Sequence, residues 1–240
     1  MDFFINLFNL ILYQPLFNIL ILFYQYLPGQ DFGIAIILLT ILIRILFYPL
    51  GMKSIKSQKV LGDLQSKIRE IRKKYKDDKE KQTRTIMELY QKEKINPFSG
   101  CLPLLIQFPI LVALYQVLRK GLVPEEMINL YSFVPYPSQI NFTFLGIINL
   151  SQPSIILAAL AGILQFIQAK MISFEGPKNR IGDRIDQFSK IFQKQTLYFF
   201  PILTFLILFK LPSAIGLYWL VSTVFTIFQQ YLIFKTQAVL

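Results

Sequence analysis

Long apolar segments alternate with blocks of charge, and this alternation constrains the chain more than any other feature. The first clear apolar segment, residues 31–50 (DFGIAIILLTILIRILFYPL), would form a helix about 30 Å long, which matches the hydrocarbon core of a bilayer. Further apolar segments follow at residues 98–118, 154–172, 196–211 and 213–233. Hydrophobic residues make up 54% of the chain. We therefore expect an all-α polytopic membrane protein, built as a five-span helical bundle.

The basic residues lie almost entirely on one side of these segments. Lys and Arg number 14 in residues 51–97 and 6 in residues 170–195, whereas the other side carries only Arg119, Lys120 and Lys210. Loops rich in Lys and Arg stay in the cytoplasm. We therefore expect the N-terminus outside a bacterial cell membrane, the C-terminus in the cytoplasm, and the loop 119–153 outside.

Residues 1–30, ahead of the core at 31–240, have two interpretations. Residues 1–28 are apolar enough to span, which would place the N-terminus inside, but polar residues interrupt them: Asn6, Asn9, Gln14 and Asn18. Pro15 suits the first turn of a helix, and Pro28-Gly29 suits its end. We therefore prefer a helix from about Pro15 to Tyr26 that lies in the outer interface.

The charged segment 51–97 predicts a cytoplasmic helical hairpin. A coiled-coil pattern on one helix, with apolar residues at steps of 3 and 4, is formed by Leu61, Leu64, Ile68, Ile71 and Tyr75. The sequence KDDK at 76–79 breaks this pattern before a second helix. The hairpin is either a solvated connector or a basic arm that touches anionic headgroups, ribosomal RNA or an incoming chain.

The sequence offers little for hydrolytic chemistry. There is no histidine and one cysteine, Cys101, so a His-based triad, a disulfide framework and a Cys/His metal site are excluded. Neither GxxxxGK[ST] nor a GxGxxG after a strand-like run occurs. We therefore expect no enzyme, no metal and no cofactor, and take Cys101 as a packing residue.

Arg44 is the most informative single residue, because it lies inside an apolar span. An arginine at a helix centre costs about 2.5–3.5 kcal/mol on insertion scales, and such residues usually face a bundle interior or a water-filled cavity. The spans contain no acidic residue beyond Asp31 at the outer edge, so we expect water in a cavity open to the cytoplasm. The alternative is snorkelling, in which the side chain only reaches the inner headgroups.

Other polar residues in the spans support such a cavity. Thr40 lies one helical turn before Arg44 on the same face, and two other spans carry Gln107, Gln116, Gln165 and Gln168. Each glutamine is equally well explained as a hydrogen-bonding contact between helices. The fourth span has only about 16 residues, or roughly 24 Å, which suggests local thinning of the bilayer. Thinning beside a hydrated positive charge would lower the cost of moving a short polar segment across.

Three stretches resemble the YidC/Oxa/Alb family of membrane protein insertases: TILIRILFYPL at 40–50, Lys94 to Leu118, and Leu211 to Gln230. The resemblance implies five spans around a hydrophilic groove, open to the cytoplasm and to lipid and closed to the outside. By motif, Arg44 matches the family's groove arginine and Thr40 the polar position before it. Gln107 lies in the matching LLIQFP motif, and the last span carries the matching aromatic pair, Tyr218 and Trp219.

The resemblance implies an insertase of a short form, without a large extracytoplasmic domain. Its partners would be nascent membrane proteins, the lipid bilayer and, through the hairpin 51–97 and the cytoplasmic loop 173–195, the Sec translocon and the ribosome. One alternative is a transporter or channel with an anion-attracting Arg44. Against it stand the absence of an acidic ion site in the spans and the long basic hairpin, which small-molecule transport does not need. A passive scaffold subunit is the third class.

Overall fold

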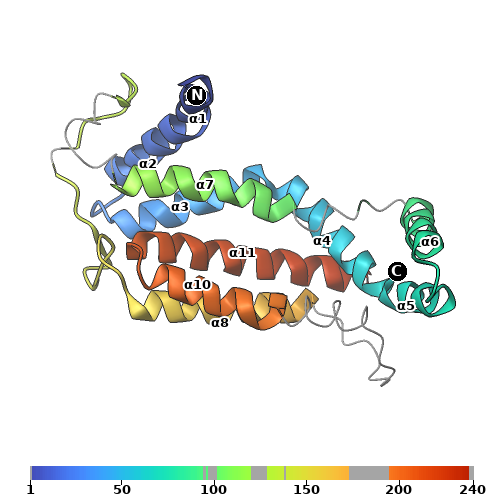
Figure 1. Cartoon of the computed structure of the whole chain (residues 1–240). Coiled ribbons are helices and arrows are strands. Elements are labelled where there is room, and N and C mark those ends of the chain that lie inside the picture. The colour runs from blue at the N-terminus through green and yellow to red at the C-terminus, as the bar shows by residue number, and fades with distance from the viewer. Residues whose placement is uncertain are drawn as a thin grey trace.

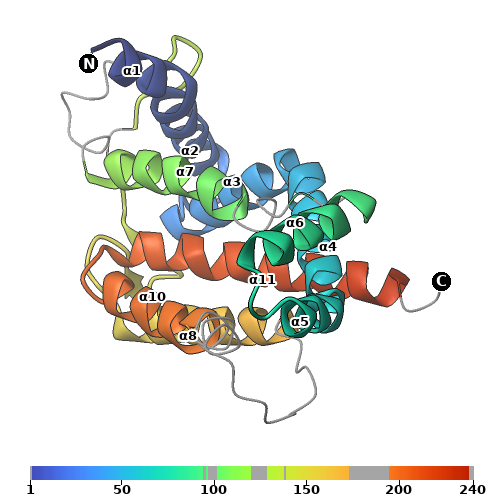
Figure 2. The same cartoon turned by 45° about the vertical axis from the view of Figure 1, so that its right-hand side comes forward.

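The computed structural model describes residues 2–93, 96, 102–119, 129–137, 139–172 and 195–237, and most of these are helical (Figure 1). Helix α11 (Ser213–Gln237) is central. It lies between α3 (Phe32–Leu46) and α7 (Leu102–Arg119) on one side and α8 (Ile155–Ile172) and α10 (Phe200–Leu208) on the other (Figures 1 and 2). These helices run side by side, as expected for a membrane bundle.

Length and composition identify the helices that can cross a bilayer. Two continuous stretches of the described residues qualify, Phe3–Tyr26 and Ser213–Thr236, and a third if α3 and the bent continuation α4 (Tyr48–Asp63) count as one span. Ile155–Met171 and Leu197–Leu208 are apolar but shorter. The all-α polytopic architecture is confirmed, and the number of five spans stays a prediction.

The N-terminal helix begins earlier than expected. The helix predicted from about Pro15 to Tyr26 corresponds to α2 (Gln14–Tyr26), but α1 (Asp2–Phe8) and the π-helix η1 (Asn9–Tyr13) precede it without a break. Pro15 has no N–H for the carbonyl of Ile11, and its ring would clash with that carbonyl in a regular α-helix. The π turn, in which the N–H of Gln14 donates to the carbonyl of Asn9, accommodates this.

The same π turn recurs before Pro201, where η4 (Gln195–Phe199) leads into α10. The described part of this span is therefore Gln195 to Leu208, about 21 Å of helix at ~1.5 Å per residue, which is shorter than a hydrocarbon core of about 30 Å. The predicted start at residue 196 lies at the edge of the described residues, but the helix ends before the predicted 211 because Lys210-Leu211-Pro212 forms the turn into α11.

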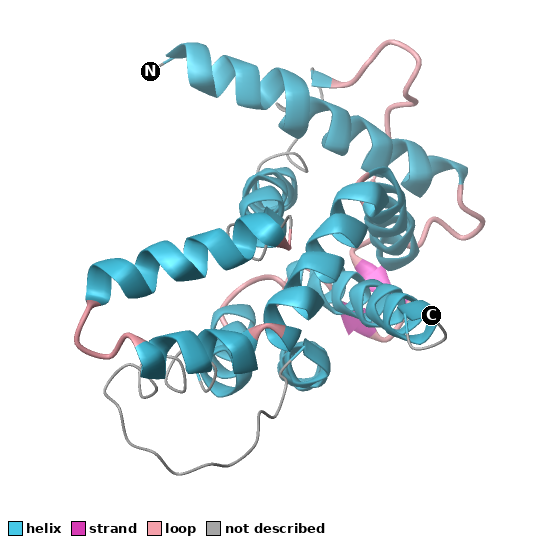
Figure 3. Ribbon diagram, turned by 90° about the vertical axis from the view of Figure 1, so that its right-hand side faces the viewer, coloured by secondary structure: helices cyan, strands magenta, loops and turns pink. Residues whose placement is uncertain are grey.

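The N-terminal helix crosses the bundle. Figure 3 looks nearly along α11, and the N-terminal helix runs across that view. Hydrogen bonds fix its α2 part to the segment of residues 129–152, which we call the outer cap after its predicted location. Asn18 Nδ2 donates to the carbonyl of Asn129 at 3.1 Å, and the N–H of Tyr131 donates to Asn18 Oδ1 at 2.6 Å. The sequence suggested that Asn18 interrupts a span. In the structure its side chain joins α2 to the outer cap by hydrogen bonds. The crossing direction favours the interfacial placement, which stays a prediction.

Asp31 joins the outer cap to the start of α3. One carboxylate oxygen accepts from the N–H of Ile34 at 2.9 Å and caps the helix, and the other accepts from the N–H of Leu145 at 2.6 Å. Leu145 adopts φ 51°, a left-handed conformation that is costly for leucine, in the turn between β1 (Thr143–Phe144) and β2 (Ile148–Asn149). Asp31 thus stabilises both a helix start and a strained turn.

The first predicted span, 31–50, is not one helix. Helix α3 ends at Leu46, and α4 leaves at 67° to it. Pro49 has no N–H for the carbonyl of Ile45, and its ring would clash with it, so the chain breaks at Phe47 and restarts with Pro49 in the first turn of α4. The other spans agree better: α8 matches 154–172, α7 overlaps 98–118 from residue 102 on, and α11 continues beyond the predicted 233.

Within the segment predicted as a cytoplasmic hairpin, α5 (Gln65–Lys74) packs on α6 (Lys79–Lys92), and Asp78 caps α6 through the N–H of Lys81 at 2.9 Å. The hairpin as a whole, and its cytoplasmic location, stay predictions. The helix is interrupted at Leu64, so the predicted coiled-coil pattern runs from α4 into α5 and not along one helix. Leu64 and Ile68 are its buried members. We call residues 48–92 the basic arm.

Replacing Asp31 by alanine should destabilise the fold. The loss of a helix cap and of a charge-assisted hydrogen bond together is expected to lower the free energy of unfolding by about 1–3 kcal/mol. Thermal unfolding in detergent would show this as a fall of about 2–4 °C per kcal/mol. Asp31→Asn, which keeps a capping oxygen, should lose less. Equal midpoints for native protein and Asp31→Ala would contradict this role.

Candidate functional site

Arg44 is joined to two other helices by a chain of side-chain hydrogen bonds. It lies in the last turn of α3, where its Nη2 donates to Gln107 Oε1 of α7 at 3.0 Å. The Nε2 of Gln107 in turn donates to the hydroxyl of Tyr218 on α11. We call Arg44, Gln107 and Tyr218 the arginine relay.

The partner of Arg44 in the arginine relay is an amide and not a carboxylate. Ion pairs among the described residues include Lys67–Glu93 and Arg84–Glu88, and neither of them involves Arg44. The amide dipole of Gln107 therefore stabilises the Arg44 charge. The Arg44 side chain is only half-buried, so the medium around the protein also contacts it. An uncompensated cation at this place can attract negative charge.

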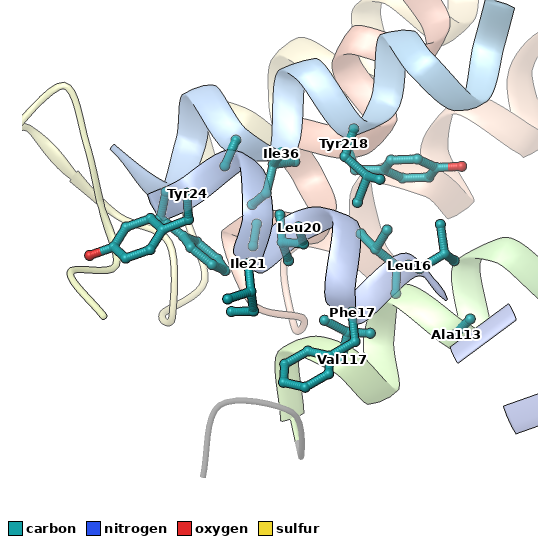
Figure 4. Close-up of a cluster of buried hydrophobic side chains, with 14 of the residues drawn as sticks. Leu16, Phe17, Leu20, Ile21, Tyr24, Ile36, Ala113, Val117 and Tyr218 are labelled. Carbon is teal, nitrogen blue, oxygen red and sulfur yellow. The ribbon is translucent and has the colours of Figure 1, made fainter. Parts of the chain in front are cut away.

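Tyr218 is held firmly at the other end of the relay. Its side chain is 1% exposed and belongs to the main hydrophobic cluster, which α2, α3, α7 and α11 build together (Figure 4). In Figure 4 the Tyr218 hydroxyl points out of the drawn cluster, so that the ring packs in the core while the oxygen reaches a polar partner. The predicted site residues Arg44, Gln107 and Tyr218 are thus brought together.

The second predicted aromatic residue belongs to a different contact. Trp219 Nε1 donates to Gln165 Oε1 of α8 at 3.1 Å. Consecutive residues of a helix point about 100° apart, so Tyr218 and Trp219 reach different partners. The described residues thus form two separate polar contacts from neighbouring positions of α11, and a single groove lined by all the predicted residues stays a prediction.

The remaining predicted residues are not joined to either contact. Thr40 is fully buried, and its hydroxyl donates to the carbonyl of Ile36 at 2.6 Å within its own helix. Gln116 follows Gln107 by nine residues and therefore lies on the opposite side of α7. Gln168 is half-buried on α8. Their roles in a groove stay predictions.

The sequence interpretation missed that Gln107 is the direct acceptor for Arg44, and it also missed Gln229. Gln229 is 3% exposed and donates from Nε2 to the carbonyl of Tyr48 at 3.1 Å, where α4 begins. A polar residue on the last span was the available signal, but nothing in the sequence indicated its partner. No group of three or more potential metal ligands occurs among the described residues.

The basic arm carries an excess of positive charge over its whole length. Thirteen Lys and Arg residues between 48 and 92 face six acids. Burial raises the pKa of Tyr90, which Arg72 only partly offsets, so this phenol stays neutral at physiological pH and adds no negative charge. The arm thus keeps its net positive charge.

Comparison with known proteins now identifies the family. A family model described as 60Kd inner membrane protein matches residues 22–238, nearly the whole chain. The chain belongs to this family. Its resemblance to the YidC/Oxa/Alb insertases, first noticed in three motifs, is thereby confirmed, and the chain is a multi-pass membrane protein.

Relatives within the 60Kd inner membrane protein family carry the name membrane protein insertase YidC. The one from Fusobacterium nucleatum is 36% identical over 208 residues, covering 87% of this chain and 88% of that protein. The one from Oceanobacillus iheyensis is 35% identical over 211 residues, covering 86% and 76%. The one from Geobacter sulfurreducens is 36% identical over 220 residues, covering 92% of this chain but 36% of that longer protein.

The arginine relay should behave as one coupled unit. Tyr218→Phe removes the acceptor of a part-buried amide, so we expect it to lower the free energy of unfolding by about 1–3 kcal/mol. Gln107→Leu should lower the free energy of unfolding by a similar amount. The loss in the double variant should be clearly smaller than the sum of the two single losses, and the difference, the coupling energy, should be about 0.5–3 kcal/mol. Denaturant unfolding in detergent measures this. Trp219→Phe serves as the control, because its effect should add to that of Gln107→Leu.

Proposed function

We propose that this chain is a membrane protein insertase, which lowers the barrier for transmembrane segments and short tails to enter the bilayer. The observation that carries the proposal is the arginine relay: a half-buried cation near the inner end of α3, with an amide and not a carboxylate as its partner. Membership in the 60Kd inner membrane protein family supports it.

The relay suggests how insertion works. An acidic residue in the polar tail of an incoming chain is attracted to Arg44, because no carboxylate among the described residues neutralises this charge. The apolar segment behind it then partitions into lipid beside the short helices α8 and α10, where the bilayer is thinned. No covalent step and no nucleotide is required, so the protein acts without being an enzyme.

Hydrophilic surroundings of Arg44, open to the cytoplasm and to lipid, are part of this proposal. The N-terminus lies outside and the C-terminus in the cytoplasm, which puts the basic arm on the cytoplasmic side, where it meets nascent chains, the ribosome or the Sec translocon. The clustering of basic residues between spans supports this orientation.

Insertion should depend on the charge of Arg44. The test uses liposomes containing the native protein or a variant, a single-span substrate with a short acidic N-terminal tail, and protease protection as the readout. For Arg44→Ala we expect about tenfold slower insertion, which corresponds to about 1.4 kcal/mol of lost stabilisation. Arg44→Lys should retain much of the rate, and Arg119→Ala, at the other end of the bundle, should be unaffected.

The outcomes separate the classes of function. Insertion by the native protein no better than by empty liposomes would refute the insertase proposal and point to transport. Equal insertion by native protein and Arg44→Ala would leave an insertase whose arginine only snorkels to the headgroups.

The orientation is testable in intact cells. In a Cys101→Ser background, a thiol reagent that cannot cross membranes should label Gln30→Cys, which lies in the exposed turn before α3, without permeabilisation. Lys79→Cys, exposed at the tip of the basic arm, should react only after the membrane is opened. The reverse pattern would invert the topology.

A further inference from the structure

Helix α4 leaves the bundle along the inner half of α11. The ring of Tyr48 packs edge-on against Phe225, with centroids 6.5 Å apart, and Lys59 Nζ lies 5.5 Å from the centroid of the Phe234 ring. Between these two contacts, Gln229 Nε2 donates to the carbonyl of Tyr48 at 3.1 Å. The first turn of α4 is therefore fastened to α11 immediately after the 67° bend.

Gly51 makes this contact possible. A Cβ atom at residue 51 would lie 3.1 Å from both Nε2 and Oε1 of Gln229, which is tighter than ordinary contact. Gln229 is itself 3% exposed, so its amide has little free space to move aside. The absence of a side chain at Gly51 lets the Gln229 amide lie against the first turn of α4.

The fully buried part of α4 is small. The structure describes all of this helix, and its buried residues are Ser54 and Ile55, although it also contacts α3, α7 and α8 besides α11. Beyond them the arm continues into α5 and α6, which pack mainly on each other. A helix with so small an apolar face needs specific polar contacts to take one direction.

We propose that Gln229, the carbonyl of Tyr48 and Gly51 form a latch that fixes the direction of the basic arm relative to the arginine relay. Tyr218 of the arginine relay and Gln229 of the latch both lie on helix α11, about 16 Å apart along its axis. Gln229 is then a positioning residue. The consequence for insertion rests on the proposed function: the latch keeps the arm, which receives the incoming chain, beside Arg44.

The first test measures the arm directly and needs no insertion activity. Spin labels at Leu38→Cys on α3 and Lys73→Cys on α5, in a Cys101→Ser background in liposomes, report the distance across the bend. We expect a single narrow distribution of label distances for the otherwise native protein. For Gln229→Leu we expect a broad distribution. Phe228→Leu, at an exposed neighbouring position, is the matched control and should keep the narrow distance. An unchanged distribution in Gln229→Leu would overturn the latch.

A combination of variants separates the latch from general damage to the fold. Gly51→Ala should broaden the distance distribution, because its Cβ displaces the Gln229 amide. Gln229→Leu has already lost the hydrogen bond to the Tyr48 carbonyl, so adding Gly51→Ala to it should broaden the distribution no further. A double variant clearly broader than Gln229→Leu alone would contradict the proposal.

The same variants in the insertion assay test the consequence. Gln229→Leu is expected to slow insertion severalfold although Arg44 is intact, and Phe228→Leu to leave it unchanged. A broadened arm with undiminished insertion would refute the link between arm and insertion. Failure of the native protein to insert would refute the proposed function, while the distance measurements would still decide the latch.

Discussion

A guanidinium inside an apolar bundle requires a hydrogen-bond acceptor, and in this protein the acceptor connects the helices around Arg44. Arg44 bonds to an amide, and that amide bonds to a tyrosine, so α3, α7 and α11 are connected through one short chain of polar atoms. A carboxylate would have neutralised the arginine and made a closed ion pair. An amide stabilises the cation while leaving its charge available, which is the property that attraction of an acidic tail requires.

Helix α11 connects much of the bundle, because its polar side chains form hydrogen bonds with three different helices. Tyr218 connects to α7, Trp219 to α8 and Gln229 to α4. Between helices surrounded by lipid there is little hydrophobic driving force, so packing and hydrogen bonds decide which helices meet and in what register. The polar residues of this otherwise apolar helix therefore specify the arrangement of the bundle as well as its site.

The two ends of the bundle are built on different principles. At the end where α3 and α11 begin, Asp31, Asn18 and the N–H of Ser213, which donates to the carbonyl of Gln152 at 2.9 Å, fasten the outer cap to three helices. At the opposite end, α3 breaks at Phe47, Arg44 is half-buried, and a long basic arm extends away. Hydrogen bonds therefore dominate one end of the bundle and positive charge dominates the other.

Hydropathy, charge blocks and three motifs determined from the sequence alone that this is an all-α membrane protein of the insertase family, because burial in lipid demands long apolar helices and leaves few places for charge. They also singled out Arg44, since a lone arginine in a span is conspicuous. What only the tertiary structure decided is which polar groups meet. Gln107 and Tyr218 are far apart in sequence, Trp219 turns to a different helix than its neighbour Tyr218, and Pro15 is tolerated inside a helix by a π turn. Such pairings depend on how helices rotate and pack against one another, and hydropathy and charge along a single chain carry no direct record of that.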